Sequence, residues 1–128
     1  MFVRVYGTLD EPILQTFERF CELIGPWPGM FVEPDGSFVW AMHTDAGRLQ
    51  LDGMIYDQAG HIEYLELKGH CTRELWTALC SFLVPPRSLP ATQLPLHELP
   101  LRIHDIQQES WMTAGEALQS LVALEGNT

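Results

Sequence analysis

Apolar and polar residues alternate in three segments between Ser37 and Gly69, and turns that contain Asp and Gly separate these segments. A period of two places successive side chains on opposite faces of a β-strand. The pattern therefore predicts a three-stranded antiparallel meander whose first tight turn lies at Ala46-Gly47. In this register the apolar partners of the first hairpin share one face, and the pairs are Met42 with Leu51, Trp40 with Gly53 and Phe38 with Ile55.

The second hairpin is predicted to turn through a three-residue loop in which Gly60 is left-handed, because this loop keeps apolar partners together. The resulting pairs are Leu51 with Leu67 and Gly53 with Leu65. Since Gly53 has no side chain, it leaves room for the indole of Trp40.

The opposite face of this meander is not polar, although an antiparallel sheet with one face in water normally alternates apolar with polar side chains. Four positions form an apolar cluster there: Met54, Tyr56, Ile62 and Tyr64. Large exposed apolar patches are uncommon on monomers, so we expect something to cover this cluster. The candidates are the proline-rich segment from Pro85 to Pro100 or the C-terminal helix, a protein partner or a second copy of the chain, and a small ligand.

Helical spacing of apolar residues predicts two helices that flank the meander. The first begins at Asp10-Glu11-Pro12, where an aspartate cap and a proline suit the first turn, and it ends at Gly25-Pro26. Its apolar stripe consists of Ile13, Phe17, Phe20, Cys21 and Ile24. Thr72 caps the second helix, whose stripe consists of Leu75, Trp76, Leu79, Cys80 and Leu83.

Two further strands and a last helix complete the predicted fold. Phe2 to Gly7 and Leu101 to Ile106 have strand character, and Thr113 to Glu116 is a capping box for a helix that carries Ala117, Leu118, Leu121 and Val122. The order is β-α-β-β-β-α-β-α, which predicts a single α+β domain over residues 1–128. We expect an antiparallel sheet of three to five strands with helices packed on one face.

The charge balance narrows the classes of partner. The chain has 128 residues and a net charge of -10, and Lys68 is its only lysine, so it lacks a basic stripe that could follow phosphates or an anionic membrane. We therefore expect neither nucleic acid nor membrane as a partner. No secretory leader or long apolar run is evident, which predicts a cytoplasmic protein. Cys21, Cys71 and Cys80 lack a CxxC spacing and are expected to be small buried hydrophobic residues.

Signatures of catalysis, metal binding or nucleotide binding are not found, so we expect no cofactor and no enzyme. The best acid/base candidate is Asp52 with Glu66, which the predicted register makes cross-strand neighbours beside Tyr64. The alternative is that both carboxylates are solvated charges. A metal site built from His43, His61, Glu63 and His70 has poor geometry, because His61 and Glu63 fall on the face opposite His43.

These observations support three hypotheses about function. The first is a non-enzymatic acidic binding protein that meets a protein partner, or a second copy of itself in a dimer, through the cluster Met54, Tyr56, Ile62 and Tyr64 with Asp52 and Glu66. The second is a small-molecule binding domain with an aromatic pocket lined by Trp27, Phe31, Trp40 and Trp76. The third is the enzyme based on Asp52 and Glu66. The sequence identifies neither a ligand nor a pathway.

The order of elements from Ile13 to Val122 also permits a comparison with known architectures. A helix is followed by three antiparallel strands, a helix, a strand and a final helix in a small acidic chain. This order is similar to that of the small dimeric chaperones that serve type III secretion. The resemblance implies a dimer with a polypeptide partner, and an immunity-type protein is a related possibility because acidic charge steers association with basic surfaces.

Overall fold

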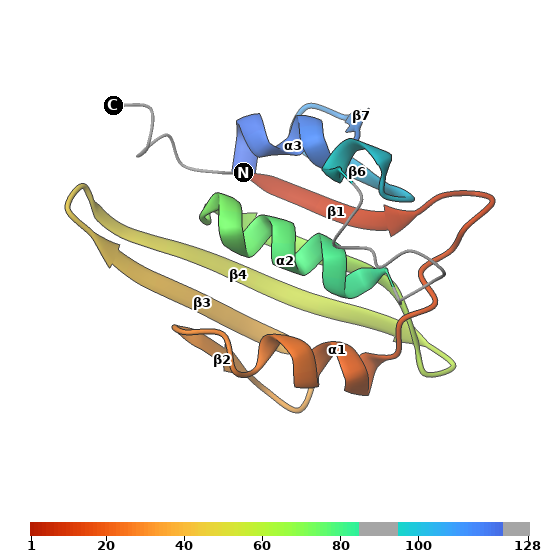
Figure 1. The fold of residues 1–128 in the computed structure, drawn as a ribbon, viewed down its shortest axis with the longest axis horizontal. Coiled ribbons are helices and arrows are strands. Elements are labelled where there is room, and N and C mark those ends of the chain that lie inside the picture. The colour runs from red at the N-terminus through yellow and green to blue at the C-terminus, as the bar shows by residue number, and fades with distance from the viewer. Residues whose placement is uncertain (85–94, 122–128) are drawn as a thin grey trace.

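The computed structural model describes residues 1–84 and 95–121, which form an antiparallel seven-stranded sheet with three helices on one face (Figure 1). The strands, in their order across the sheet, are β2 (Met30–Val32), β3 (Ser37–Thr44), β4 (Gly47–Gln58), β5 (His61–Gly69), β1 (Phe2–Gly7), β6 (Leu101–Asp105) and β7 (Ser110–Met112). The helices are α1 (Phe17–Ile24), α2 (Arg73–Leu83) and α3 (Ala114–Leu121), and a short 3-10 helix, η2 (Leu96–Glu98), lies near α3. The predicted α+β class, the antiparallel sheet and the packing of helices on one face are confirmed.

The sheet is wider than predicted. The strands β2 and β7 have three residues each, which is too short for an alternating pattern to reveal them. The N-terminal strand β1 lies in the interior of the sheet, where it pairs with β5 on one side and β6 on the other. It thereby joins the meander to the C-terminal strands.

Helix α1 begins later than predicted, at Phe17, where the side chain of Thr16 accepts a hydrogen bond from the Arg19 N–H. The preceding residues form backbone hydrogen bonds with the β4–β5 hairpin instead of a helical turn. The Gln15 carbonyl accepts from the Ile62 N–H at 3.0 Å, and the Phe17 N–H donates to the Gly60 carbonyl at 3.1 Å. The helix ends at Gly25, as predicted.

The other two helix starts agree with the sequence. The Thr72 hydroxyl accepts from the Leu75 N–H, and all five residues of the predicted α2 stripe are buried. In the capping box of α3, the Thr113 N–H donates to the Glu116 carboxylate at 2.8 Å, and the Glu116 N–H donates to the Thr113 hydroxyl at 3.1 Å. The C-terminal helix packs against α2, since the buried Trp76 Nε1 donates to the Ala114 carbonyl at 2.8 Å.

Both hairpins have the predicted faces but are shifted by two residues. The first turn is Asp45-Ala46 instead of Ala46-Gly47, because Thr44 pairs with Gly47. The observed pairs are Met42 with Leu49, Trp40 with Leu51, Phe38 with Gly53, Leu51 with Gly69, Gly53 with Leu67 and Ile55 with Leu65. A slip of two residues preserves the face of every side chain, so alternation alone cannot detect it. Gly53 consequently accommodates Phe38 and not Trp40.

The second turn is shorter than predicted, and a bulge changes the position of Ile62. Ala59 and Gly60 both have positive φ, 55° and 86°, in a two-residue turn between Gln58 and His61. The register then shifts between Tyr56 and Asp57, so that a bulge follows the turn. The prediction that Ile62 faces outward was wrong, because the bulge turns it into the core, where it is 2% exposed.

Candidate functional site: the outer sheet face

The candidate site is the outer face of the sheet, which is the face opposite the three helices. Neighbouring strands align its side chains in rows. One row consists of Tyr56, Tyr64, Tyr6 and Arg102, and the next consists of Met54, Glu66, Arg4, His104 and Trp111. A third row consists of Phe31, Val39, Asp52, Lys68 and Phe2.

Five rings from these rows are in contact, and we call Tyr56, Tyr64, Tyr6, Trp111 and His104 the aromatic ladder. The ring centroids of Tyr56 and Tyr64 are 4.6 Å apart, and those of Tyr64 and Tyr6 are 5.1 Å apart. Trp111 lies 5.6 Å from Tyr6 and 4.6 Å from His104. Such contacts between rings stabilise the strand pairs that carry them.

Glu66 connects the ladder to Arg4. Its Oε1 atom lies 3.3 Å from both Nε and Nη2 of Arg4, and its Oε2 atom accepts a hydrogen bond of 3.2 Å from the Tyr56 hydroxyl. The negative charge of Glu66 is the main cause that raises the pKa of Tyr56 above its usual value. The pKa of Arg4 is also raised, first by its hydrogen bond with Tyr6 and then by Glu66. This network fixes the side chains in the middle of the ladder.

Arginine side chains also lie over two of the rings. The guanidinium carbon of Arg4 is 5.4 Å from the ring centroid of Tyr64, and that of Arg102 is 4.6 Å from Trp111. Arg102 additionally donates from Nε to the Gly7 carbonyl at 3.2 Å. Cation–π contacts therefore hold both arginines against the ladder.

The ladder is accessible in the described structure. Tyr56 is 37% exposed and Trp111 is 52% exposed, while the other three members are half-buried. The expectation that the C-terminal helix covers this face was wrong, because α3 packs beside α2 on the other face (Figure 1). The other segment that was predicted to cover this face is Pro85 to Pro100, and its residues 85–94 lie outside the described part of the chain. Its described end at Leu96 lies beside α2 and α3 on the helix face.

The sequence predicted only part of this site. Met54, Tyr56 and Tyr64 lie on the outer face as predicted, whereas Ile62 does not. Tyr6 and Trp111 were missed because they come from β1 and β7, which the sequence did not place beside the meander. The signal for Tyr6 was the alternation in Phe2 to Gly7, which puts Phe2, Arg4 and Tyr6 on one face.

The proposed acid/base pair is not formed as predicted. Asp52 lies opposite Lys68 and accepts a hydrogen bond of 3.0 Å from Gln50 Nε2. Glu66 lies opposite Met54, and both of its carboxylate oxygens already have partners. The shift of register separates the two carboxylates by one row and places a cation beside each of them.

The metal candidates do not converge either. His43 lies near the β3–β4 turn, whereas His61 and Glu63 lie at the far end of β5. Within residues 1–84 and 95–121, no group of three or more His, Cys, Asp or Glu side chains could hold a metal ion. In the same residues, no helix combines the length and apolarity needed to cross a membrane.

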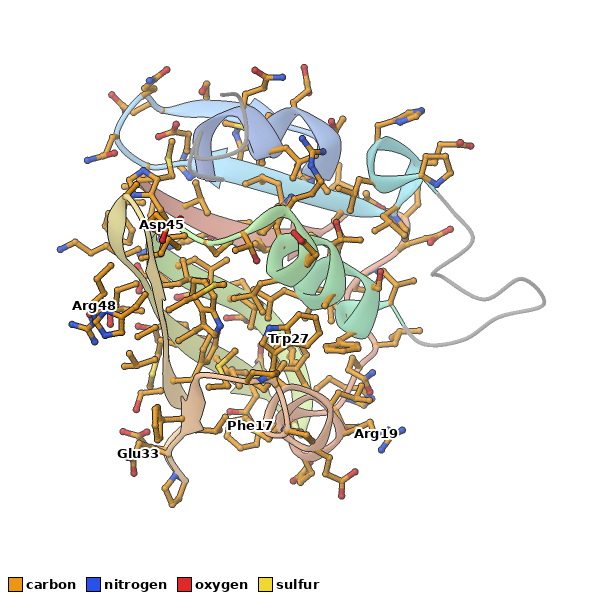
Figure 2. All side chains as sticks on the ribbon, turned by 60° about the vertical axis from the view of Figure 1, so that its left-hand side comes forward. Phe17, Arg19, Trp27, Glu33, Asp45 and Arg48 are labelled. Carbon is orange, nitrogen blue, oxygen red and sulfur yellow. The ribbon has the colours of Figure 1, made fainter. Side chains whose placement is uncertain are left out.

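The predicted aromatic pocket is divided between the two faces. Trp76 and Trp40 are core residues, and Phe31 is 70% exposed on the outer face. Trp27 does border open space: it lies between α1 and α2 in Figure 2 and lines two adjoining hollows of about 400 and 500 Å3. Trp40 and Met42 line the first hollow, and Phe82 and Leu96 line the second.

None of the three cysteines, all of which lie in the described residues, forms a disulfide bond. Cys71 and Cys80 are buried, and Cys21 is half-buried on α1. Burial raises the pKa of the Cys80 thiol well above its usual value and also raises that of Cys21. A raised pKa keeps a thiol protonated and therefore weakly nucleophilic.

Comparisons with protein families, with curated proteins and with solved structures gave no match to this chain. The arguments for function therefore come from the geometry of the chain itself.

Proposed function

We propose that this chain is a non-enzymatic binding protein that holds a protein partner against the aromatic ladder. The observation that carries the proposal is the exposure of Trp111 and Tyr56 within a continuous series of ring contacts, on a sheet face that none of the described helices covers. Tryptophan, tyrosine and arginine are the residues most enriched among those that dominate binding energy at protein interfaces. The ladder and its two arginines have this composition.

The fixed geometry of the ladder also favours binding. The contacts of Glu66 with Arg4 and Tyr56 already order these side chains, so a partner loses less conformational freedom on docking.

Affinity capture with matched variants tests this proposal. We would purify partners from the cells that naturally make this protein, using the wild type, Trp111→Ala and Phe31→Ala. Phe31 is the matched control because it is an exposed aromatic residue on the same face but outside the ladder. The captured protein is then produced in pure form, and its affinity for each variant is measured by calorimetry.

We expect the purified partner to bind the wild type and Phe31→Ala equally and to bind Trp111→Ala at least about thirtyfold more weakly, the usual loss at a dominant interface residue. Equal binding by all three variants would contradict the proposal. Sedimentation equilibrium of the isolated wild type and of Trp111→Ala tests whether the partner is a second copy of the chain. If the wild type is a dimer and Trp111→Ala is a monomer, the chain is its own partner.

A second candidate function is the binding of an apolar small molecule beside Trp27. The two hollows that Trp27 lines have volumes of about 400 and 500 Å3, which lie within the range of small-ligand sites of about 300 to 1,000 Å3. Binding of the apolar dye 1-anilinonaphthalene-8-sulfonate should quench Trp27 fluorescence. Dye binding that is equal in the wild type and Trp27→Ala would exclude this site.

A further inference from the structure

The outer face of the sheet carries few of the acidic residues of the chain, which has 17 acidic and 7 basic residues in all. In the rows of paired strand positions on this face, two residues are acidic and four are basic: Asp52 and Glu66, and Arg4, Arg48, Lys68 and Arg102. Two more acids lie outside these pairs, Glu63 at the bulge of β5 and Glu109 in the turn before β7. Most of the net charge of -10 therefore belongs to other surfaces of the chain.

The boundary between β5 and β1 divides this face into two halves of opposite charge. In the two rows that contain the aromatic ladder, the half on β4 and β5 carries an acid, and the half on β1 and β6 carries two arginines. The first half consists of Tyr56, Tyr64, Met54 and Glu66, and the second consists of Tyr6, Arg102, Arg4 and His104. A face with two such halves is complementary to a copy of itself.

We propose that the partner is a second copy of the chain, which docks with its outer face on the outer face of the first. The inference rests on the proposed function, since it names the partner of the same site. The two-fold axis runs along the strands, in the plane between the two sheets and over the boundary between β5 and β1. Each half of one face then lies on the opposite half of the other, and the same patch of both copies forms the interface.

This axis brings complementary side chains together across the interface. Glu66 of one copy faces Arg4 of the other, so that the pair within each copy, at 3.3 Å, extends into a ring of four alternating charges. Tyr56 of one copy faces Arg102 of the other. Arg102 uses its Nε atom for the Gly7 carbonyl, and its two Nη atoms form no hydrogen bond within the described residues. A guanidinium group against a tyrosine ring is a favourable contact.

The face is large enough for a dimer. The axis aligns the six strands from β3 to β7 with their symmetry mates and leaves β2, with Phe31, outside the interface. Strands about 4.8 Å apart and three rows about 7 Å apart give a flat area of about 600 Å2. The relief of the side chains raises this area toward the roughly 800 Å2 that each partner buries in a standard interface. Trp111 lies near the edge of this area, opposite Ser37 of the other copy.

The acidic charge of the chain opposes association through this face only weakly. At physiological ionic strength, exposed charges more than about 8 Å apart are largely screened. The contact therefore depends on the charges of the paired rows, where basic residues outnumber acidic ones. A foreign partner with a uniformly acidic or basic surface would match only one half of the face, whereas a second copy matches both.

Sedimentation equilibrium of two charge-reversed variants tests the inference. Glu66→Arg makes the pair within each copy entirely basic, and Arg4→Glu makes it entirely acidic. The matched controls, Glu22→Arg and Arg19→Glu, make the same reversals in the exposed ion pair on α1. Circular dichroism and thermal unfolding establish that each variant is folded. The milder variant Arg102→Ala supplies a second test that does not depend on the reversals.

We expect the wild type and both controls to sediment as dimers. Each reversal alone should raise the dissociation constant of the dimer at least about thirtyfold, because like charges then face each other. An equimolar mixture of the two reversals should restore the dimer, since a basic pair then faces an acidic pair. Arg102→Ala should weaken the dimer about tenfold through the loss of two symmetric contacts with tyrosine.

A wild type that stays a monomer at millimolar concentration would overturn the inference. It would leave the proposed function standing, because a different protein that depends on Trp111 would then occupy the ladder. A dimer that both reversals leave intact would overturn the inference, and so would two monomeric reversals that do not associate when mixed. The proposed function itself fails separately, when neither the dimer nor any captured protein depends on Trp111.

Discussion

The ring of Phe38 occupies the space that a side chain at Gly53 would need. The two residues pair across β3 and β4, and a Cβ atom at Gly53 would overlap with three ring carbons of Phe38. Phe38 is 1% exposed, so its ring has little freedom to move away. The absent side chain at Gly53 is therefore a packing requirement of the core.

Replacing Gly53 with alanine should destabilise the protein by about 1 to 3 kcal/mol, the usual cost of overpacking a core. Chemical denaturation measures the change in the free energy of unfolding. The smaller side chain in Phe38→Leu should relieve the overlap, so the two substitutions should cost less together than the sum of their separate effects. Additive effects would contradict the packing relationship.

Trp76 should matter far more to stability than Trp111. Trp76→Phe removes the buried hydrogen bond to the Ala114 carbonyl and leaves a gap between α2 and α3, so we expect a loss of about 2 to 4 kcal/mol. Trp111→Phe is the matched control, and it should change stability by less than about 0.5 kcal/mol. Urea denaturation of both variants measures these losses, and equal losses would contradict the assignment of Trp76 to the core and Trp111 to the surface.

The phenol of Tyr56 should titrate above its usual pKa because the carboxylate of Glu66 disfavours the phenolate. A pKa that is higher in the folded state contributes stability below the unfolded pKa of about 10, and this contribution is lost as pH rises through the folded pKa. NMR titration of the Tyr56 ring measures the shift. In Glu66→Gln the pKa should move down toward its usual value, and an unchanged pKa would contradict the contact.

The capping box of α3 should contribute to the stability of the C-terminal region. Thr113→Ala removes the hydroxyl that accepts from the Glu116 N–H, so we expect a loss of about 1 kcal/mol in thermal or chemical denaturation. The control is Thr77→Ala in the middle of α2, where the side chain is exposed and alanine favours the helix. A loss in Thr77→Ala as large as that in Thr113→Ala would show that the cap is not its cause.

The sequence by itself determined the local elements and the faces they bury. The helical stripe from Leu75 to Leu83 is buried, and Thr72 and Thr113 cap their helices as predicted. Alternation in the meander placed Phe38, Leu51 and Leu65 in the core. These features depend on side chains a few residues apart, so their periodicity is visible in a single chain.

The tertiary structure alone decided register, strand order and the composition of the site. The observed register differs from the predicted one by two residues. The sequence could not detect this difference, because such a slip leaves every side chain on the same face, and the bulge that buries Ile62 has no signal in the alternation. The ladder requires Tyr6 beside Tyr64 and Trp111 beside Tyr6, which come from distant parts of the chain. The pairing of β1 with both β5 and β6 brings them together, and this pairing depends on how the whole sheet buries its apolar face against the helices.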